Sequence, residues 1–428
     1  MVLKVLIITY YWPPAGGPGV QRWLKFVKYL REFDIEPVLY IPENPTYPLH
    51  DESLVSEIDE EITILKHPIF EPYSFARFFS RKETKTISKG IISDTERQSW
   101  IQKVLLYIRG NFFIPDARKF WVTPSVKYLE KYISNHKIQT IITTGPPHSV
   151  HLIGEKLKKQ TGVKWLADFR DPWTTIGYQS KLKLTKSSQQ KHKNLEKEVL
   201  DTANHIIVTS FRTQEEFREI TNTNVSVITN GYDIEKVESD VLDSIFTISH
   251  IGSLLSGRNP KKLWKALFEL THEYPDFADV FRLQLVGAVS EDVLMSIKEA
   301  GLSDFLIVKG YVAHAEAIKI QRSSQVLVLI EIDSEDTRCI IPGKLFEYMV
   351  SQRPILALGP KDADVSRLLK ETNAGTFFEY HEYEEIKNQI LDYFKSFQEG
   401  ELASQVLDIK KYSRRELTRK LADLIKTL

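Results

Sequence analysis

The segment 342–349 places a lysine and a glutamate close together at the expected start of a helix. Pro342 and Gly343 predict a turn, and the helix follows it. Glu347 then lies in about the first turn of that helix, where its carboxylate can accept two hydrogen bonds from a vicinal diol such as that of ribose. Lys344 and the backbone at Pro342 and Gly343 can face a phosphate group. For a glutamate considered alone, an ordinary surface position is the simpler interpretation, so the assignment depends on other segments.

A second segment, 253–262, is basic. Arg258, Lys261 and Lys262 cluster where a helix is expected to begin, and the pair Asn259-Pro260 suits its N-cap and first turn. Lysines at a helix start are unfavourable with the helix dipole, which favours an anionic partner that meets side chains and backbone N–H groups together. The alternative is a solvated basic patch.

A third segment, Pro13-Pro-Ala-Gly-Gly-Pro-Gly19, joins the first expected strand to a helical stripe. Gly16 and Gly17 allow close approach of the backbone, and the following helix start offers free N–H groups to an anion. The segment fits neither the dinucleotide fingerprint nor the phosphate-binding loop motif. A tight turn without a ligand explains it equally well.

Polar side chains also follow buried strands in the first half of the chain. Asp168, Arg170 and Asp171 precede Trp173, and charged groups at such a position are costly if they serve only packing. His148 and Asp171 are candidates for a base that accepts a proton from a hydroxyl. For His148, a packed loop histidine is an equal alternative.

Short apolar runs that alternate with amphipathic helical patterns must position these residues. Strands that are apolar throughout are buried on both faces, so the pattern predicts parallel sheets covered by helices. Two successive sets predict an α/β protein of two doubly wound, Rossmann-like domains. The expected strands are Val5–Ile8, Pro37–Ile41, Thr140–Thr143, Trp165–Ala167, His205–Val208, Thr247–Ile251, Leu283–Val286, Phe305–Val308, Val326–Ile330 and Ile355–Ala357.

The Asn230-Gly231 turn signal and the polar stretch after it predict the hinge. We expect domains at 1–235 and 236–409, with a charged amphipathic helix at 410–428 that returns to the first domain. The segment 74–119 interrupts the alternation with ten lysines or arginines against four acids and with interleaved aromatic residues. It is expected either to lie on an anionic membrane surface or to form a helical cap on the first domain.

Composition excludes several classes of function. The 428 residues carry 57 basic and 57 acidic side chains, so no global field attracts nucleic acid, and no nucleic-acid motif is present. The single cysteine, Cys339, excludes an intrachain disulfide and a cysteine zinc cluster. No run reaches the roughly 18–20 apolar residues of a membrane span. The expected location is the cytoplasm, with peripheral contact at the inner face of the plasma membrane as an extension of the membrane hypothesis.

Taken together, these segments resemble the retaining family-4 glycosyltransferases of bacteria, nearly from end to end. The motifs that carry the resemblance are Pro13-Pro-Ala-Gly-Gly17, Thr144-Gly-Pro-Pro-His148, Asp168-Phe-Arg-Asp-Pro-Trp173, Thr229-Asn-Gly-Tyr-Asp233, Ile251-Gly-Ser253 with Arg258, Gly310-Tyr-Val-Ala-His314, Pro342–Met349 and Arg353-Pro-Ile-Leu. The resemblance implies the GT-B fold, in which the C-terminal domain binds a nucleoside-diphosphate sugar and the N-terminal domain binds the acceptor across a cleft.

The resemblance also implies roles for individual residues. Glu347 would hold the ribose hydroxyls, Arg258 would bind the donor phosphates as catalytic stabiliser, and Asp168, Arg170 and Trp173 would lie on the acceptor side. The other residues implied at the donor are Gly16, Gly17, Gly252, Ser253, Lys261, Tyr311, Val312, Gly343, Lys344 and Leu345.

Two departures from the family pattern stand out. Ser253 replaces an arginine, so Lys261, Lys262 or Lys344 would have to assist Arg258. Cys339 replaces the first of two glutamates, the second of which is Glu347. Four acids just upstream are candidates for the missing carboxylate: Glu331, Asp333, Glu335 and Asp336.

The implied function is transfer of a sugar, with retention, from a nucleoside-diphosphate sugar to a saccharide or lipid-linked saccharide in cell-surface polysaccharide or glycolipid synthesis. We expect no tightly bound cofactor and no required metal ion. The alternatives are a sugar-nucleotide 2-epimerase and a non-catalytic nucleotide-sugar-binding protein.

Overall fold

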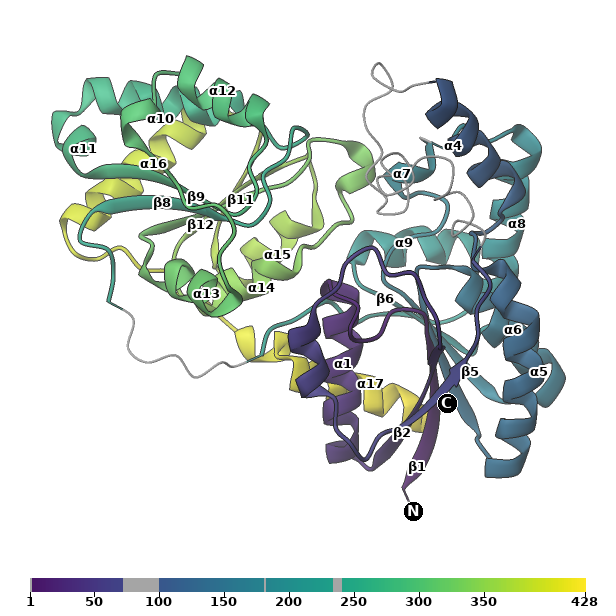
Figure 1. Ribbon diagram of the computed structural model, residues 1–428. Helices are drawn as coiled ribbons and strands as arrows, with labels where there is room; N and C mark the ends of the chain where they lie inside the picture. The colour runs from purple at the N-terminus through teal and green to yellow at the C-terminus, as the bar shows by residue number, and fades with distance from the viewer. Residues whose placement is uncertain (1, 72–99, 181, 234–240) are drawn as a thin grey trace. The chain divides into compact units, whose positions relative to one another are not determined.

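The computed structural model describes residues 2–71, 100–180, 182–233 and 241–428, and they form two compact units (Figure 1). Unit 1 comprises Met1–Asn230 and Arg414–Leu428, and unit 2 comprises Gly231–Ser413. The chain therefore leaves unit 1 at the Asn230-Gly231 turn and returns to it for the last helix.

Unit 1 contains a parallel sheet in the order β3-β2-β1-β4-β5-β6-β7. Its central strands β1, β4 and β5 are almost wholly buried, as strands are in a parallel sheet covered by helices on both faces. The strands are β1 (Leu3–Thr9), β2 (Ile35–Pro42), β3 (Thr63–His67), β4 (Thr140–Gly145), β5 (Lys164–Phe169), β6 (His205–Val208) and β7 (Val225–Val227).

The helices of unit 1 follow the strands in βαβ order, and α1 packs against α17 while α5 packs against α6. They are α1 (Pro18–Leu30), α4 (Trp100–Phe112), α5 (Lys119–His136), α6 (Ser149–Thr161), α7 (Gly177–Ser180), α8 (Lys186–Thr202), α9 (Phe211–Ile220) and α17 (Arg414–Thr427). Helix α17 buries Leu417 and Leu421. It begins at Arg414, later than the expected residue 410, because residues 409–412 form a 3₁₀ turn.

Unit 2 repeats the arrangement with a parallel sheet in the order β10-β9-β8-β11-β12-β13. Its strands are β8 (Phe246–Ile251), β9 (Phe281–Val286), β10 (Leu306–Val308), β11 (Val326–Ile330), β12 (Ile355–Gly359) and β13 (Gly375–Glu379). Its helices are α10 (Lys261–Glu273), α11 (Pro275–Val280), α12 (Glu291–Glu299), α13 (His314–Ser323), α14 (Gly343–Val350), α15 (Asp364–Thr372) and α16 (Tyr383–Gln398).

Both sheets have the strand order of a doubly wound fold, so the expectation of two Rossmann-like domains is confirmed. The order reverses between β1 and β4 in unit 1 and between β8 and β11 in unit 2. Loops that leave the carboxyl ends of these paired strands diverge, and ligands of such sheets bind there. The candidate residues after β1, β4, β8 and β11 all lie at these two points.

All ten expected strands are present, whereas β3, β7 and β13 were not expected. These three strands are edge strands and are short or only half-buried, so they lack the continuous apolar run of a central strand. The segment 74–119 lies between β3 and β4. Residues 74–99 are outside the described residues, so the membrane hypothesis is untested there. Within the described parts of the chain, no helix is long and apolar enough to span a bilayer.

Candidate functional site

The loop after β8 is held in one conformation at the carboxyl edge of the unit 2 sheet. The Tyr348 hydroxyl accepts a hydrogen bond from the Ile251 amide at 2.9 Å and donates to the Ile251 carbonyl at 3.1 Å. The next residue, Gly252, has φ +122°, a conformation that side chains rarely adopt. A Cβ atom at Gly252 would lie only 3.2 Å from Nζ of Lys344. The glycine therefore lets an ammonium group approach the backbone.

Lys344 is the second residue of α14 and points to this loop. Its Nζ lies 3.4 Å from Nε2 of His250, which is buried on β8 and bonded through Nδ1 to the Val328 carbonyl at 3.0 Å. Burial lowers the pKa of Lys344 to about 8, although the nearby Glu331 raises it and the side chain is not fully enclosed. A lysine close to its titration point thus stands at the N-terminus of a helix, where anions are favoured.

Arg258 and Glu331 complete the charged group around Lys344. One guanidinium nitrogen of Arg258 lies 3.8 Å from the Glu331 carboxylate. Glu331 follows β11 directly and is only 3% exposed. Nε of Arg258 and Oε1 of Glu331 are buried and have no hydrogen-bond partner among the described residues. We call Arg258, Glu331 and Lys344 the charged cluster. It holds a donor and an acceptor whose hydrogen bonds the protein itself does not satisfy.

Glu347 is the fifth residue of α14, so it lies in the second turn and not in the first. Oε2 accepts a hydrogen bond of 3.3 Å from the Gln321 amide on α13, and the side chain remains partly exposed. One carboxylate oxygen is thereby oriented, while the group can still accept hydrogen bonds from a ligand. Lys344 precedes Glu347 by just under one helical turn.

The other expected donor residues of unit 2 differ in accessibility. Ser253 and Lys261 are exposed, Tyr311 is 94% exposed, and Val312 and Gly343 are intermediate. Leu345 is fully buried, so only its backbone is available, and its amide already bonds to the Pro342 carbonyl at 3.1 Å.

The start of α10 corrects two details. Pro260 occupies the N-cap, and the Asn259 side chain instead bonds to Trp264 and Ser296 at 2.8 Å each. Lys262 donates to the His381 carbonyl at 2.9 Å. Of Lys261, Lys262 and Lys344, only Lys344 acts with Arg258 on the Glu331 carboxylate among the described residues.

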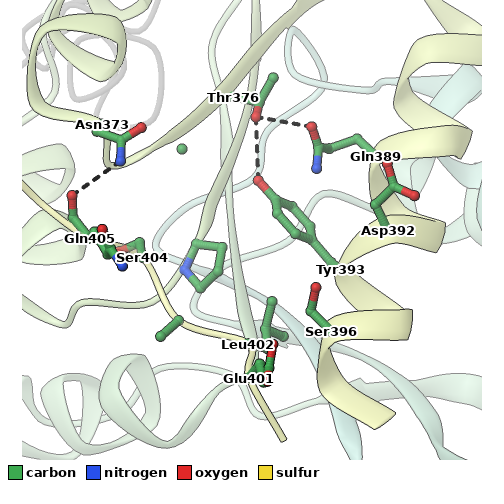
Figure 2. A pocket seen from close by; sticks show the side chains of 13 residues that line it. Asn373, Thr376, Gln389, Asp392, Tyr393, Ser396, Glu401, Leu402, Ser404 and Gln405 are labelled. Atoms are coloured by element: carbon green, nitrogen blue, oxygen red, sulfur yellow. Dashed lines mark hydrogen bonds between the residues drawn. The ribbon is translucent and has the colours of Figure 1, made fainter. Parts of the chain in front are cut away.

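A pocket of about 380 Å³ lies at the opposite edge of the unit 2 sheet, where β12 and β13 begin (Figure 2). Figure 2 shows the Thr376 hydroxyl bonded to Gln389 and to the Tyr393 hydroxyl, and Asn373 bonded to the backbone of Gln405. The charged side chains in its lining are Asp392 and Glu401, both acidic. Without a lining cation, this pocket does not suit a phosphate group.

In unit 1, the glycine loop after β1 has the expected geometry. Gly17 has φ +110° and is the N-cap of α1, with open space where its Cβ would lie. Gly16 donates to the Leu49 carbonyl at 3.0 Å. A Cβ at Gly19 would overlap the Arg170 guanidinium at 1.6 Å. The glycines thus admit Arg170. Among the first residues of α1, Pro18 has no N–H group, and the amides of Val20 and Gln21 already donate to the Gly17 carbonyl at 3.1 and 3.2 Å.

Asp168 is fully buried and forms the centre of a hydrogen-bonded network. It accepts hydrogen bonds from Arg22 at 3.2 Å, from Trp23 at 2.8 Å and from Thr144 at 2.8 Å. Arg22 is also buried and donates to the Thr229 carbonyl at 2.6 Å. The expected contact of Asp168 with an acceptor is not supported by this position, because its carboxylate is enclosed and already bonded on both oxygens.

Arg170 and Asp171 lie nearer the surface than Asp168. Arg170 donates to the carbonyl of Gly145 at 3.2 Å and to that of Pro146. Its guanidinium also lies over the Tyr11 ring. Burial raises the pKa of Asp171, and Arg170 lowers it. Asp171 is therefore a partly accessible carboxylate whose basicity is increased, as a general base requires.

His148 is 4% exposed and its ring stacks on Trp173, with ring centres 5.0 Å apart and planes within 4°. Burial lowers the pKa of His148 to about 3, and both ring nitrogens lack hydrogen-bond partners among the described residues. The imidazole is therefore neutral and enclosed. Its position supports the packed-histidine alternative, and Trp173 is likewise buried.

Several residues that build the site were not singled out from the sequence. Gln321 orients Glu347, His250 lies beneath Lys344, and Tyr348 fixes the Gly252 loop. Only Tyr348 had a local signal, since it belongs to the same motif as Glu347. Gln321 and His250 come from other elements, and no spacing rule links them to that motif.

No protein-family model matches the sequence, and no curated protein sequence matches it significantly. Solved structures match its fold along the whole chain. A glycosyltransferase from Rickettsia africae ESF-5 is 14% identical, with a TM-score of 0.61, and 99% of this chain covers 98% of that chain. Anabaena HepE, solved in complex with UDP-glucose, is 13% identical, with a TM-score of 0.59 and full coverage of both chains. A Listeria monocytogenes protein described as a UDP-N-acetylglucosamine 2-epimerase is 10% identical, with a TM-score of 0.55, and 100% of this chain covers 96% of that chain. The expectation of a GT-B fold is thereby confirmed.

Proposed function

We propose that the protein is a glycosyltransferase that moves a sugar from a nucleoside-diphosphate sugar to an acceptor hydroxyl, with retention of configuration. The observation that carries the proposal is the charged cluster beside Gly252, with Glu347 just under one helical turn from Lys344. Cations at a helix N-terminus suit a diphosphate, and a carboxylate nearby suits the ribose diol. The GT-B fold supports the same assignment.

In this proposal, unit 2 binds the donor. Arg258, Lys344 and the first amides of α14 bind the diphosphate, and Glu347 accepts hydrogen bonds from both ribose hydroxyls. Gly252 permits the close approach of phosphate to backbone that a side chain would block. Tyr311 and Val312, on the loop after β10, would lie near the base.

The same groups would stabilise the reaction's leaving group. When the glycosidic bond breaks, negative charge develops on the β-phosphate of the departing nucleoside diphosphate. Arg258, Lys344 and a helix N-terminus are fixed cationic partners for that charge, and such preorganised groups are a major source of catalysis. We therefore propose that no divalent ion is required, so turnover should persist in EDTA.

Unit 1 would bind the acceptor, a saccharide or lipid-linked saccharide used in cell-surface polysaccharide or glycolipid synthesis. Asp171 is the preferred candidate to accept the hydroxyl proton, because its carboxylate is partly accessible and its pKa is raised by burial. Gly16, Gly17 and Arg170 lie at the same sheet edge and would contact the acceptor or the donor phosphates. Peripheral membrane contact through 74–119 remains part of the proposal.

The test is a thermal-shift panel with the diphosphates of uridine, guanosine, thymidine and adenosine. A ligand that binds only the folded state raises the unfolding temperature. At one hundred times its Kd it adds about 2.7 kcal/mol to the free energy of unfolding. One nucleotide should raise the melting temperature of the wild type, and Glu347→Ala should abolish most of the shift. Glu335→Gln is the matched control, because Glu335 is an exposed acid that pairs with Arg338 outside the cluster. A flat response of the wild type to all four nucleotides would refute the donor-site assignment.

The Listeria fold neighbour supports one alternative, a sugar-nucleotide 2-epimerase. An epimerase would use the same donor site but no acceptor. Incubation with the sugar nucleotide that shifts the melting temperature, without acceptor, distinguishes the two: an epimer of the sugar indicates epimerase activity. Binding without turnover in the presence of candidate acceptors would favour a non-catalytic nucleotide-sugar-binding protein.

A further inference from the structure

Glu331 is a buried carboxylate next to Arg258, one of the two cations that we propose bind the donor diphosphate. Its backbone is fixed on both sides, because its amide donates to the Leu358 carbonyl at 2.8 Å and its carbonyl accepts from the Tyr380 hydroxyl at 2.7 Å. The side chain is 4% exposed. The carboxylate is therefore enclosed and is carried by a hydrogen-bonded segment of backbone.

The groups that face Glu331 come from every neighbouring element. Burial raises the pKa of Glu331, and Arg258 from the loop after β8 and Lys344 from α14 offset part of that rise. Lys344 itself contacts the neutral His250 on β8. The remaining titratable groups nearby are Tyr348 and Glu347 on α14, Tyr380 after β13, and Asp333 on the loop after β11.

Within the cluster, the charges of Arg258, Lys344 and Glu331 sum to +1 while the site is free. Two cations face Glu331 inside the cluster, and Glu347 lies further along α14, bonded to Gln321. A sugar nucleotide adds two negative charges next to Arg258 and Lys344. The cluster and the diphosphate together then carry a net charge of −1, and a like charge beside a buried carboxylate disfavours its ionised form, so protonation of Glu331 becomes favourable.

We propose that Glu331 is the counter-ion of Arg258 and Lys344 in the free protein and takes up one proton from solvent when the donor diphosphate binds. This inference rests on the proposed function. The proton is placed on Oε1, and the resulting hydroxyl donates to a phosphate oxygen. Arg258 then turns its unsatisfied Nε–H towards the phosphate as well. Glu331 is thus a positioning residue for the two cations, and it couples donor affinity to pH.

The unsatisfied atoms support this proposal independently of titration behaviour. Oε1 of Glu331 and Nε of Arg258 are both buried without partners among the described residues. Buried polar atoms in native proteins are nearly always paired. A phosphate oxygen that accepts from both groups would satisfy both at once, whereas an ionised Glu331 would repel it.

Four acids precede Cys339 in the sequence, and the structure separates them by their contacts and exposure. Glu331 alone pairs with Arg258. Glu335 pairs with Arg338 at 3.0 Å, and Asp336 accepts a hydrogen bond from Ser334. Asp333 is exposed. Glu331 is therefore the acid that lies within reach of the donor phosphates.

The experiment is calorimetric titration of the full chain with UDP-, GDP-, dTDP- and ADP-glucose at pH 5.0–6.5. Sugar nucleotides are used because nucleoside diphosphates carry a terminal phosphate with a pKa near 6 that would itself titrate. At or below pH 6.5 Lys344, whose pKa is about 8, is protonated before and after binding. Titrations in two buffers of different ionisation enthalpy at pH 6.0 then give the number of protons taken up.

Wild-type protein should take up between about half a proton and one proton per ligand, and its Kd should fall as the pH is lowered, by up to about tenfold per pH unit. Glu331→Gln should bind without proton uptake and with a nearly flat Kd over the same range. The control Glu335→Gln should behave as the wild type. Melting curves of each variant establish that it is folded.

The outcomes separate this inference from the proposed function. If the wild type binds none of the four sugar nucleotides, the donor-site proposal fails. If it binds one without proton uptake, the role of Glu331 is overturned, and this measurement needs no variant. Equal uptake in the wild type and in folded Glu331→Gln would overturn it too.

Discussion

Substitution of Lys344 tests both the donor site and the stability of unit 2. Burial of its ammonium group favours a phosphate partner but destabilises the ligand-free protein. Lowering its pKa from 10.5 to about 8 corresponds to a cost of about 3 kcal/mol in the folded state. Below pH 8 the lysine is protonated in both the folded and the unfolded chain, so the full cost is present. Above pH 8 the folded lysine loses its proton first, and the cost declines to nothing above pH 10.5.

Lys344→Met removes this cost and keeps most of the side-chain volume. The variant also leaves Glu331 with one cation in place of two, which offsets part of the gain. We therefore expect unit 2 of Lys344→Met to be more stable than the wild type by roughly 1–3 kcal/mol at pH 7. The difference should shrink as the pH rises from 8 to 10. Donor affinity should fall at least about tenfold, since a charge-assisted hydrogen bond is worth roughly 1.5–3 kcal/mol.

Hydrogen exchange of the β8 and β11 amides measures the stability of unit 2 separately from that of unit 1. Lys319→Met is the matched control, because Lys319 is an exposed lysine on α13, and it should change stability by no more than about 0.5 kcal/mol. A Lys344→Met protein that is less stable than the wild type at pH 7 would refute the reasoning. Unchanged nucleotide affinity would refute the proposed role in donor binding.

Three further substitutions test separate parts of the structure. Glu347→Ala should abolish most activity and leave the melting temperature unchanged, because the variant loses charged hydrogen bonds to the donor worth roughly 1.5–3 kcal/mol. Near-normal turnover and donor affinity would contradict the assignment of Glu347 to the ribose hydroxyls. Gly252→Ala should cost about 1–3 kcal/mol in stability and weaken donor binding, since φ is +122° and the new Cβ would lie 3.2 Å from the Lys344 ammonium. Denaturant unfolding measures the stability and nucleotide titration measures the affinity. No change in either quantity argues against the close approach. Asp168→Ala should destabilise unit 1 by about 3–5 kcal/mol because it leaves the Arg22 charge buried without its partner. Urea unfolding measures this loss, and wild-type stability would rule out the structural role.

The sequence by itself determined the architecture, because a buried strand can be recognised from a short run of consecutive apolar residues. Runs such as Val326–Ile330 are apolar at every position, and only a sheet covered on both faces accommodates them. The Asn230-Gly231 turn and the helical stripe of Leu417 and Leu421 are local signals in the same way, and the units divide at that turn. Three of the four edge strands, β3, β7 and β13, were not predicted, because short or half-buried strands have a weaker apolar pattern.

The charged cluster was decided by the tertiary structure. Arg258, Glu331 and Lys344 lie on different elements, and neighbouring parallel strands and α14 bring them together at one sheet edge. No spacing in the sequence distinguishes Glu331 from three other acids within five residues of it. Burial made that choice, since only Glu331 is enclosed against a cation.

Burial also separated residues that the sequence had grouped. Asp168 and Asp171 are three residues apart on one strand end, and the sequence gives both the same chemical type. The structure encloses Asp168 among Arg22, Trp23 and Thr144 and leaves Asp171 partly accessible. Residue type and order fix which groups a chain carries, whereas solvent exposure and partners from distant elements decide which of them remain free for a ligand.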